Sequence, residues 1–87
     1  MSSESNNNTT TLAENKVLIL YILDLIDNDI RQDDLFKIIT SINNMNYFIF
    51  KQVLTDLIES KLVGSYTKEE EPVIKITSEG KNAYILT

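Results

Sequence analysis

Lys51, Gln52 and Thr55 offer three different kinds of side-chain contact within five consecutive positions. A glutamine amide both donates and accepts and can pair with adenine, a lysine ammonium donates to guanine or phosphate, and a threonine methyl group can touch thymine. On a helix covering residues 46–60, these residues lie off the apolar stripe and face outward. The outward positions of that helix are Phe48, Lys51, Gln52, Thr55, Asp56 and Glu59.

Further candidate contacts lie at the start of the same helix and on the hairpin that we expect after it. Asn46 and Tyr47 are placed to bond phosphate oxygens, and Lys68 and Lys75 are the cations of the hairpin. The complete candidate set for DNA contact is Asn46, Tyr47, Phe48, Lys51, Gln52, Thr55 and Lys68.

The same residues also have a plainer interpretation as an ordinary solvated helix face, with Tyr47 completing the core. The run of Phe48, Ile49 and Phe50 leaves at least one aromatic edge exposed, which suits a dimer or partner contact equally well. Asp56 and Glu59 repel phosphate unless they accept from cytosine. Both interpretations therefore stay open at this point.

Charge weighs against a nucleic-acid partner. The formal net charge is -5, whereas a protein that binds phosphate-rich DNA normally presents a basic face. Residues 69–71 are three consecutive glutamates at the expected hairpin tip. A solvated tip that protects an edge strand from aggregation is the interpretation that this composition favours. Any DNA contact should therefore fall mainly on the helix at residues 46–60.

The residue types leave little room for catalysis. The chain has no cysteine and no histidine, which removes the usual zinc ligands, the thiol nucleophile and the imidazole base. Asp27, Asp29, Asp33 and Asp34 lack the glycine and the terminal glutamate of a calcium loop and suit helix ends instead. We expect no enzyme activity, no metal and no cofactor.

The elements that must position these residues follow from the apolar pattern. We expect a flexible tail at residues 1–11 and one domain at residues 12–87. The first helix is predicted at residues 12–26, opened by a capping box formed by Thr11 and Glu14. A second helix ends at Ile42, and Asn43 and Asn44 suit a left-handed turn before the helix at residues 46–60.

The C-terminal third changes from helical to alternating periodicity. Residues 62–67 and 73–77 are predicted as two strands joined by a turn at residues 68–72, and Thr77 or Ser78 can cap the start of a final helix near Glu79. The longest apolar run, residues 17–23, is far shorter than the roughly 20 residues that cross a bilayer. We therefore expect a cytoplasmic protein without membrane contact.

This order of elements is that of a winged helix-turn-helix: a three-helix core, a two-stranded wing and the start of a C-terminal helix. Four segments resemble a bacterial winged-helix family of unknown function that is itself similar to PadR-like and MarR-like transcription regulators. The segments are residues 14–23 (ENKVLILYIL), 45–48 (MNYF), 57–62 (LIESKL) and 76–80 (ITSEG). The resemblance covers about residues 12–86 and implies a DNA-binding function.

The chain departs from related regulators in having Ser60 and Lys61, where a glycine often ends the third helix, so a less favoured left-handed residue or a different cap is expected there. The leading hypothesis is a homodimeric transcription regulator that binds double-stranded DNA, since such proteins commonly read two half-sites. The alternative is a protein-interaction or dimerisation module on the same scaffold, without DNA binding.

Overall fold

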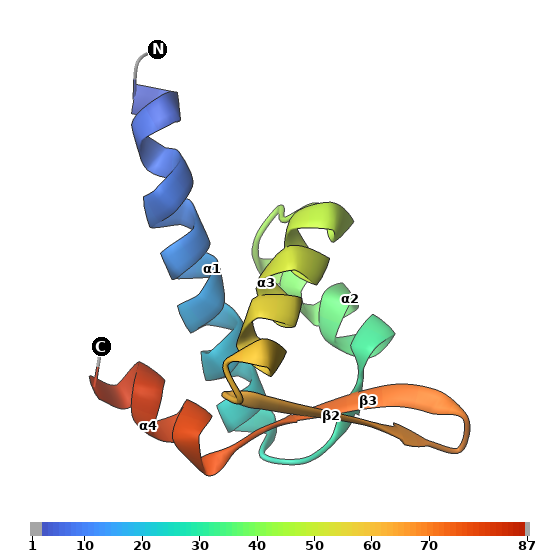
Figure 1. Ribbon diagram of the computed structural model, residues 1–87. Coiled ribbons are helices and arrows are strands. Elements are labelled where there is room, and N and C mark those ends of the chain that lie inside the picture. Colours follow the sequence, from blue (N-terminus) through green and yellow to red (C-terminus); the bar gives the residue numbers. More distant parts are fainter. Residues whose placement is uncertain (1–2, 87) are drawn as a thin grey trace.

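A computed structural model of the chain describes the backbone of residues 3–86 and the side chains of residues 13–83. Within residues 3–86 the fold is mixed α/β, with four helices and a three-stranded antiparallel sheet (Figure 1). In chain order the elements are α1 (Ser3–Ile26), β1 (Ile30–Arg31), α2 (Gln32–Ile42), α3 (Tyr47–Glu59), β2 (Val63–Lys68), β3 (Glu71–Ile76) and α4 (Ser78–Leu86).

The sheet contains one strand more than the two-stranded wing predicted from the sequence. The strand order is β1-β3-β2, and β1 pairs with β3 through Ile30 opposite Ile74 and Arg31 opposite Val73. The predicted two-strand hairpin is present as β2 and β3, whereas the third strand, β1, was not predicted. Two residues are too short to show an alternating pattern, so β1 exists only because β3 offers it an edge.

The hairpin turn is tighter than the predicted turn at residues 68–72. Lys68 pairs with Glu71, which leaves Glu69 and Glu70 as a two-residue turn with φ angles of 54° and 67°. Two consecutive positive φ angles are typical of a type I′ turn, whose twist matches that of the flanking strands. Pro72 pairs opposite Thr67 inside β3. In an antiparallel ladder every second pair exchanges no hydrogen bonds, and such a position accepts a residue without an N–H.

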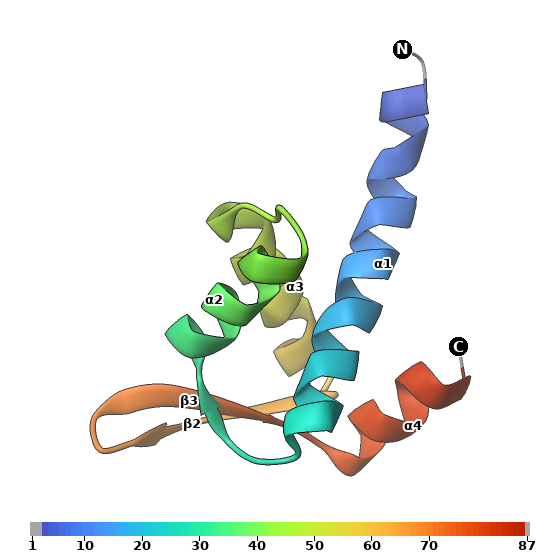
Figure 2. The ribbon, with the colours of Figure 1, turned by 180° about the vertical axis from the view of Figure 1, so that it is seen from behind.

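The helix α1 begins earlier than predicted. Its backbone is helical from Ser3, so Thr11 lies within the helix and the predicted helix start at Thr11 and Glu14 is wrong. Residues 3–11 contain no glycine or proline, and adding turns to an existing helix costs less than starting a new one. The N-terminal turns rise away from the other elements (Figures 1 and 2). The division of the chain into a flexible tail at residues 1–11 and a domain stays a prediction.

The core lies where α1, α2, α3 and the sheet meet. Phe50 on α3 and Ile19 and Leu23 on α1 have no exposed surface, and Ile74 of the central strand packs against them. The remaining buried apolar residues are Leu20, Ile22, Leu35, Ile39, Met45, Val53, Leu54, Leu57, Val63, Val73 and Ile76. α1 thus contributes one buried face to this core, whereas its apolar residues Val17, Tyr21 and Leu25 are exposed, so the helix is not packed on all sides as its nearly continuous apolar run indicates.

Both ends of α3 are fixed by local hydrogen bonds. Asn46 is its N-cap, and the Asn46 Oδ1 atom accepts from the Ile49 N–H at 2.8 Å, which confirms the predicted helix start. At the other end Lys61 has a φ of 67°, and the Leu62 N–H donates to the Leu57 carbonyl at 3.0 Å. This Schellman ending confirms the expected left-handed residue.

The turn before α3 differs from the prediction. Asn43 ends α2 in an extended conformation, with a φ of -137°, so the left-handed turn expected at Asn43 and Asn44 is wrong. The Asn43 N–H donates to the Ile39 carbonyl at 2.7 Å, and the buried Met45 side chain draws the connection back onto the core. The connection therefore needs no positive φ angle.

A single threonine joins the ends of three elements. Thr77 N-caps α4, because its Oγ1 accepts from the Gly80 N–H at 3.0 Å. The same hydroxyl lies 2.8 Å from the Lys61 carbonyl oxygen and 3.0 Å from that of Leu62, and it donates to this pair. Gly80 itself is buried against Leu62. The start of α4 is thereby fixed to the connection between α3 and β2.

Within the described residues no helix is long and apolar enough to cross a membrane.

Candidate functional site

The outer face of α3 carries a shallow, open depression of about 420 Å³. Its lining residues are Phe48, Lys51, Gln52, Thr55 and Asp56. Their spacing places them on one side of the helix, opposite the fully buried Phe50 and Leu57. Four of the seven residues predicted for DNA contact therefore form one continuous surface.

The polar side chains of this depression have no partners within the described part of the protein. Lys51, Gln52, Thr55 and Asp56 make no side-chain hydrogen bond or ion pair among residues 13–83. Gln52 and Thr55 are exposed, and Lys51 and Asp56 are half-buried. The surface thus presents an ammonium, an amide, a hydroxyl and a carboxylate that are all free to bond an external group.

Phe48 adds an apolar group to these polar ones. Its side chain is 75% exposed, more than any other large apolar side chain among residues 13–83. It lies in the first turn of α3, directly after the cap formed by Asn46. Placing an aromatic ring in water costs free energy, so its position suits contact with another molecule better than a solvated face alone.

The structure places Asn46 and Tyr47 outside the depression. The Asn46 oxygen is used in the cap. The Tyr47 ring packs edge-on against Phe36 of α2 with 5.0 Å between ring centroids, and its hydroxyl lies 3.5 Å from Gln32 Nε2. Tyr47 therefore faces α2, although it remains 47% exposed. The interpretation in which Tyr47 completes the core therefore holds only in part, because its ring packs on Phe36 but stays half exposed.

Lys68, the last predicted contact residue, is held by an ion pair. Its Nζ lies 3.1 Å from Asp29 Oδ2 in the connection between α1 and β1. The hydrogen bond and charge of Asp29 raise the pKa of Lys68, and hydrogen bonds from Lys68 and then Tyr66 lower the pKa of Asp29. The positive charge of Lys68 is therefore already balanced within the protein.

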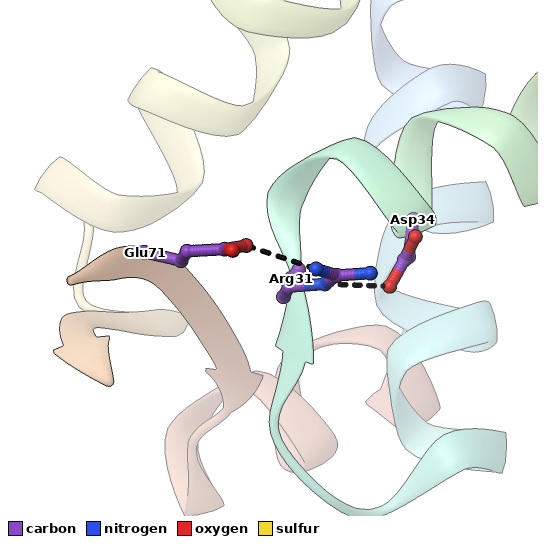
Figure 3. A network of polar contacts seen from close by, with 3 residues as sticks. All are labelled: Arg31, Asp34 and Glu71. Atoms are coloured by element: carbon purple, nitrogen blue, oxygen red, sulfur yellow. Dashed lines mark hydrogen bonds and ion pairs between the residues drawn. The ribbon is translucent and has the colours of Figure 1, made fainter. Parts of the chain in front are cut away.

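Arg31 neutralises part of the acidic hairpin in the same way. Its guanidinium lies between two carboxylates, with Nε 3.0 Å from Asp34 Oδ2 and Nη1 3.0 Å from Glu71 Oε1 (Figure 3). The hydrogen bonds that Arg31 donates to Asp34 and then to Glu71 raise the pKa of Arg31 above its ordinary value. Glu69 and Glu70 at the turn make no ion pair within residues 13–83. The hairpin tip thus stays acidic.

A third ion pair ties α4 to the end of α1. Lys81 Nζ lies 2.8 Å from Asp27 Oδ1 and 3.9 Å from Asp24 Oδ1. Of the eight lysines and arginines in the chain, three are thus paired within the described residues. The other five are Lys16, Lys37, Lys51, Lys61 and Lys75. Lys51 is the one of these that lines the depression.

Asp56 lines the depression, although its negative charge argues against contact with a phosphate. It lies eight positions after Phe48, so helical spacing alone places it on the same face. A carboxylate beside Lys51 and Gln52 gives the depression an acceptor that neither lysine nor a methyl group supplies. Glu59, the other outward acid, does not line the depression.

No curated protein matches this chain. A family model described as a domain of unknown function, DUF4364, matches residues 15–86, nearly the whole range over which the sequence resembles a family of unknown function. The match does not extend to winged-helix, PadR-like or MarR-like proteins, so that relationship stays a prediction. Because the matched range covers most of the 87 residues, the chain belongs to the DUF4364 family of domains of unknown function.

Proposed function

We propose that the protein is a DNA-binding transcription regulator of the winged helix-turn-helix type, similar to PadR-like and MarR-like regulators, with α3 entering the major groove. The order of α2, α3 and the hairpin supports this layout. The observation that carries the proposal is the depression on α3, whose polar groups have no partners among the described residues. The major groove admits one α-helix and presents donors, acceptors and methyl groups to it.

Three residues of the depression supply base contacts under this proposal. Gln52 pairs with adenine, Lys51 donates to guanine or to a neighbouring phosphate, and the Thr55 methyl group meets thymine. Each good paired contact contributes about 1–3 kcal/mol of discrimination against a wrong base. Asn46 keeps its amide N–H groups available for a phosphate, since the cap uses only its oxygen.

The hairpin contributes little to DNA binding in this proposal. Lys68 is paired with Asp29, and Glu69 and Glu70 would face the DNA backbone. Phosphate contacts then come from a few unpaired lysines, so binding weakens with salt along a shallow slope. A shallow slope with clear sequence preference is the expected signature.

We further propose that the protein binds as a homodimer, because a single domain of this size covers one half-site and binds weakly. Leu25 on α1 is 64% exposed, so α1 offers apolar surface for a second copy. In such an arrangement the two α3 helices lie about one helical turn of DNA, roughly 34–36 Å, apart.

The second candidate function is a protein-interaction module on the same scaffold. The hairpin favours it, because Lys68 is held in an ion pair with Asp29 while Glu69 and Glu70 make no ion pair within residues 13–83 and can meet a basic partner. The 75% exposed Phe48 would then contact an apolar group of that partner. This candidate predicts no measurable affinity for any duplex.

Fluorescence anisotropy at two salt concentrations separates the two functions, with labelled duplexes of random sequence and with a duplex enriched from a random-sequence pool by binding to the protein. The proposal predicts binding at low salt, and an affinity for the enriched duplex that falls in Lys51→Ala and Gln52→Ala. Lys37→Ala is the matched control, because it removes the same charge from the exposed face of α2, outside the depression. Absence of binding at low salt, or equal loss in all three variants, contradicts DNA reading by α3.

A further inference from the structure

Phe48 and Gln52 stand one helical turn apart on the depression of α3 and differ in chemistry. Residues four positions apart on a helix have Cβ atoms about 5–6 Å from each other. Phe48 is 75% exposed, and the Gln52 amide makes no hydrogen bond among the described residues. A bare aromatic ring therefore lies beside an amide that can both donate and accept.

This pairing of groups matches the major-groove edge of one kind of base pair. An A·T pair presents the adenine N7 acceptor and N6 donor, the thymine O4 acceptor and, at the far end, the thymine C5-methyl group. A G·C pair presents no apolar group on that edge. An amide next to an aromatic ring thus fits the edge of A·T and leaves the ring without a partner on G·C.

The position of Phe48 keeps its ring on the outside. Asn46 caps the helix two residues before Phe48, and its Oδ1 accepts from the Ile49 N–H at 2.8 Å, so the first turn of α3 has a fixed backbone. Two neighbours of Phe48 in the sequence, Tyr47 and Phe50, pack against Phe36 of α2, and each of their ring centroids lies 5.0 Å from that of Phe36. The space on the α2 side is therefore occupied. In helix-turn-helix proteins, the N-terminal residues of this helix contact the base edges.

Resting on the proposed function, we infer that Phe48 is a specificity-determining residue that contacts the C5-methyl group of a thymine, in the same A·T pair as the adenine read by Gln52 or in the adjacent pair. Phe48 supplies apolar contact and Gln52 supplies the hydrogen bonds. The protein then distinguishes thymine from uracil, which differs only by that methyl group.

The test uses a duplex enriched from a random-sequence pool by binding to the wild-type protein. Each thymine of the duplex is replaced singly by deoxyuridine, and affinity is measured by anisotropy. We expect one replacement to weaken binding by about fourfold, which corresponds to roughly 0.8 kcal/mol for one buried methyl-sized group. Phe48→Ala should bind the thymine and the uracil duplex with equal affinity.

Two controls keep the outcome specific. Ile42→Ala removes another exposed apolar side chain, 58% exposed at the end of α2 and outside the depression, and should leave the preference for thymine unchanged. Thr55→Ser removes the other methyl group of the depression and should act at a different thymine, if at any.

The possible results test the role of Phe48 and DNA binding separately. Equal wild-type affinity for thymine and uracil at every position overturns the role of Phe48, while DNA binding itself still stands. If Phe48→Ala keeps the same thymine preferences as wild type at every position, the role of Phe48 is also overturned. If the wild-type protein enriches no duplex at all, the proposed function fails, and the role of Phe48 fails with it.

Discussion

Gly80→Ala tests the packing between α4 and the connection that follows α3. Gly80 lies in the first turn of α4 and is buried. A Cβ atom at this position would lie 2.1 Å from the Leu62 carbonyl oxygen, 2.8 Å from Ile76 Cγ1 and 3.1 Å from the Leu62 carbonyl carbon. Two of these three atoms belong to the backbone, so no change of rotamer relieves the clash.

The sign of the effect distinguishes packing from helix propensity. Alanine in place of glycine within a helix ordinarily stabilises by about 0.5–1 kcal/mol. Overpacking a tight contact costs typically about 1–3 kcal/mol, and a backbone obstruction belongs at the upper end of that range. We therefore expect a net loss of about 2 kcal/mol in the free energy of unfolding. At about 4–8 °C per kcal/mol for a domain of this size, Tm falls by about 8–16 °C.

Thermal unfolding followed by circular dichroism measures this difference, and Gly64→Ala is the matched control. A Cβ on Gly64 would meet the Lys75 carbonyl oxygen at 3.7 Å and Thr77 Cγ2 at 3.8 Å, both ordinary contacts. Its Tm should therefore change little. A Gly80→Ala protein at least as stable as wild type would refute the close approach of Gly80 to Leu62 and the tight docking of α4.

Three further predictions concern stability. Asn46→Ala removes the cap of α3 and should lower the free energy of unfolding by about 1 kcal/mol in urea titrations, whereas Asn46→Asp should retain most of it. Glu70→Gly replaces a residue with a φ of 67° and should raise Tm, and an unchanged or lower Tm would contradict this turn geometry. A hydrogen bond from Lys81 and its charge lower the pKa of Asp27, so this pair stabilises above the unfolded-state pKa, and the stabilisation is lost as pH falls through the lower folded-state value. Between about pH 5 and pH 2, Tm should accordingly fall more for wild type than for Asp27→Asn, and equal slopes would count against the pair.

The helices α2 and α3 were predictable because their signals are local. The apolar spacing that includes Leu35 and Ile39, the cap at Asn46 and the left-handed residue at Lys61 are all readable within a few positions of where they act. The same holds for Thr77 at the start of α4. In each case short-range hydrogen bonds and periodicity select the same structure that tertiary packing requires.

Features that depend on distant partners were not predictable from the sequence. The strand β1 needs β3, since Ile30 pairs with Ile74 far along the chain. Thr77 was predicted as one of two possible caps of the last helix, but the reason for Gly80 is its close approach to the Leu62 carbonyl, which no local pattern reveals. The early start of α1 was missed for another reason. Its first residues are polar and show no helical periodicity, and they contain no glycine or proline that would end the helix.

The residues of the candidate site also divide into those placed by local spacing and those placed by distant partners. Phe48, Lys51, Gln52 and Thr55 were grouped correctly because helical spacing alone fixes which residues share a face. Tyr47 and Lys68 were not, because each is held by a residue from another element, Phe36 in one case and Asp29 in the other. The chemistry of these two side chains is evident from the sequence, but their contacts with Phe36 and Asp29 depend on the fold.

The distribution of positive charge determines what kind of DNA reader α3 could be. Arg31, Lys68 and Lys81 are paired with carboxylates, which leaves five lysines without an ion pair among the described residues to meet phosphates. Affinity that does not depend on base sequence comes from such phosphate contacts, so under the proposed function we expect it to be small in this chain. Under the proposed function, most of the binding free energy must then come from base edges, where each good contact separates right from wrong bases by about 1–3 kcal/mol. An acidic protein with few free cations thus binds DNA of any sequence weakly. Site choice in a genome depends on the ratio between specific and non-specific affinity, and weak non-specific binding does not lower that ratio.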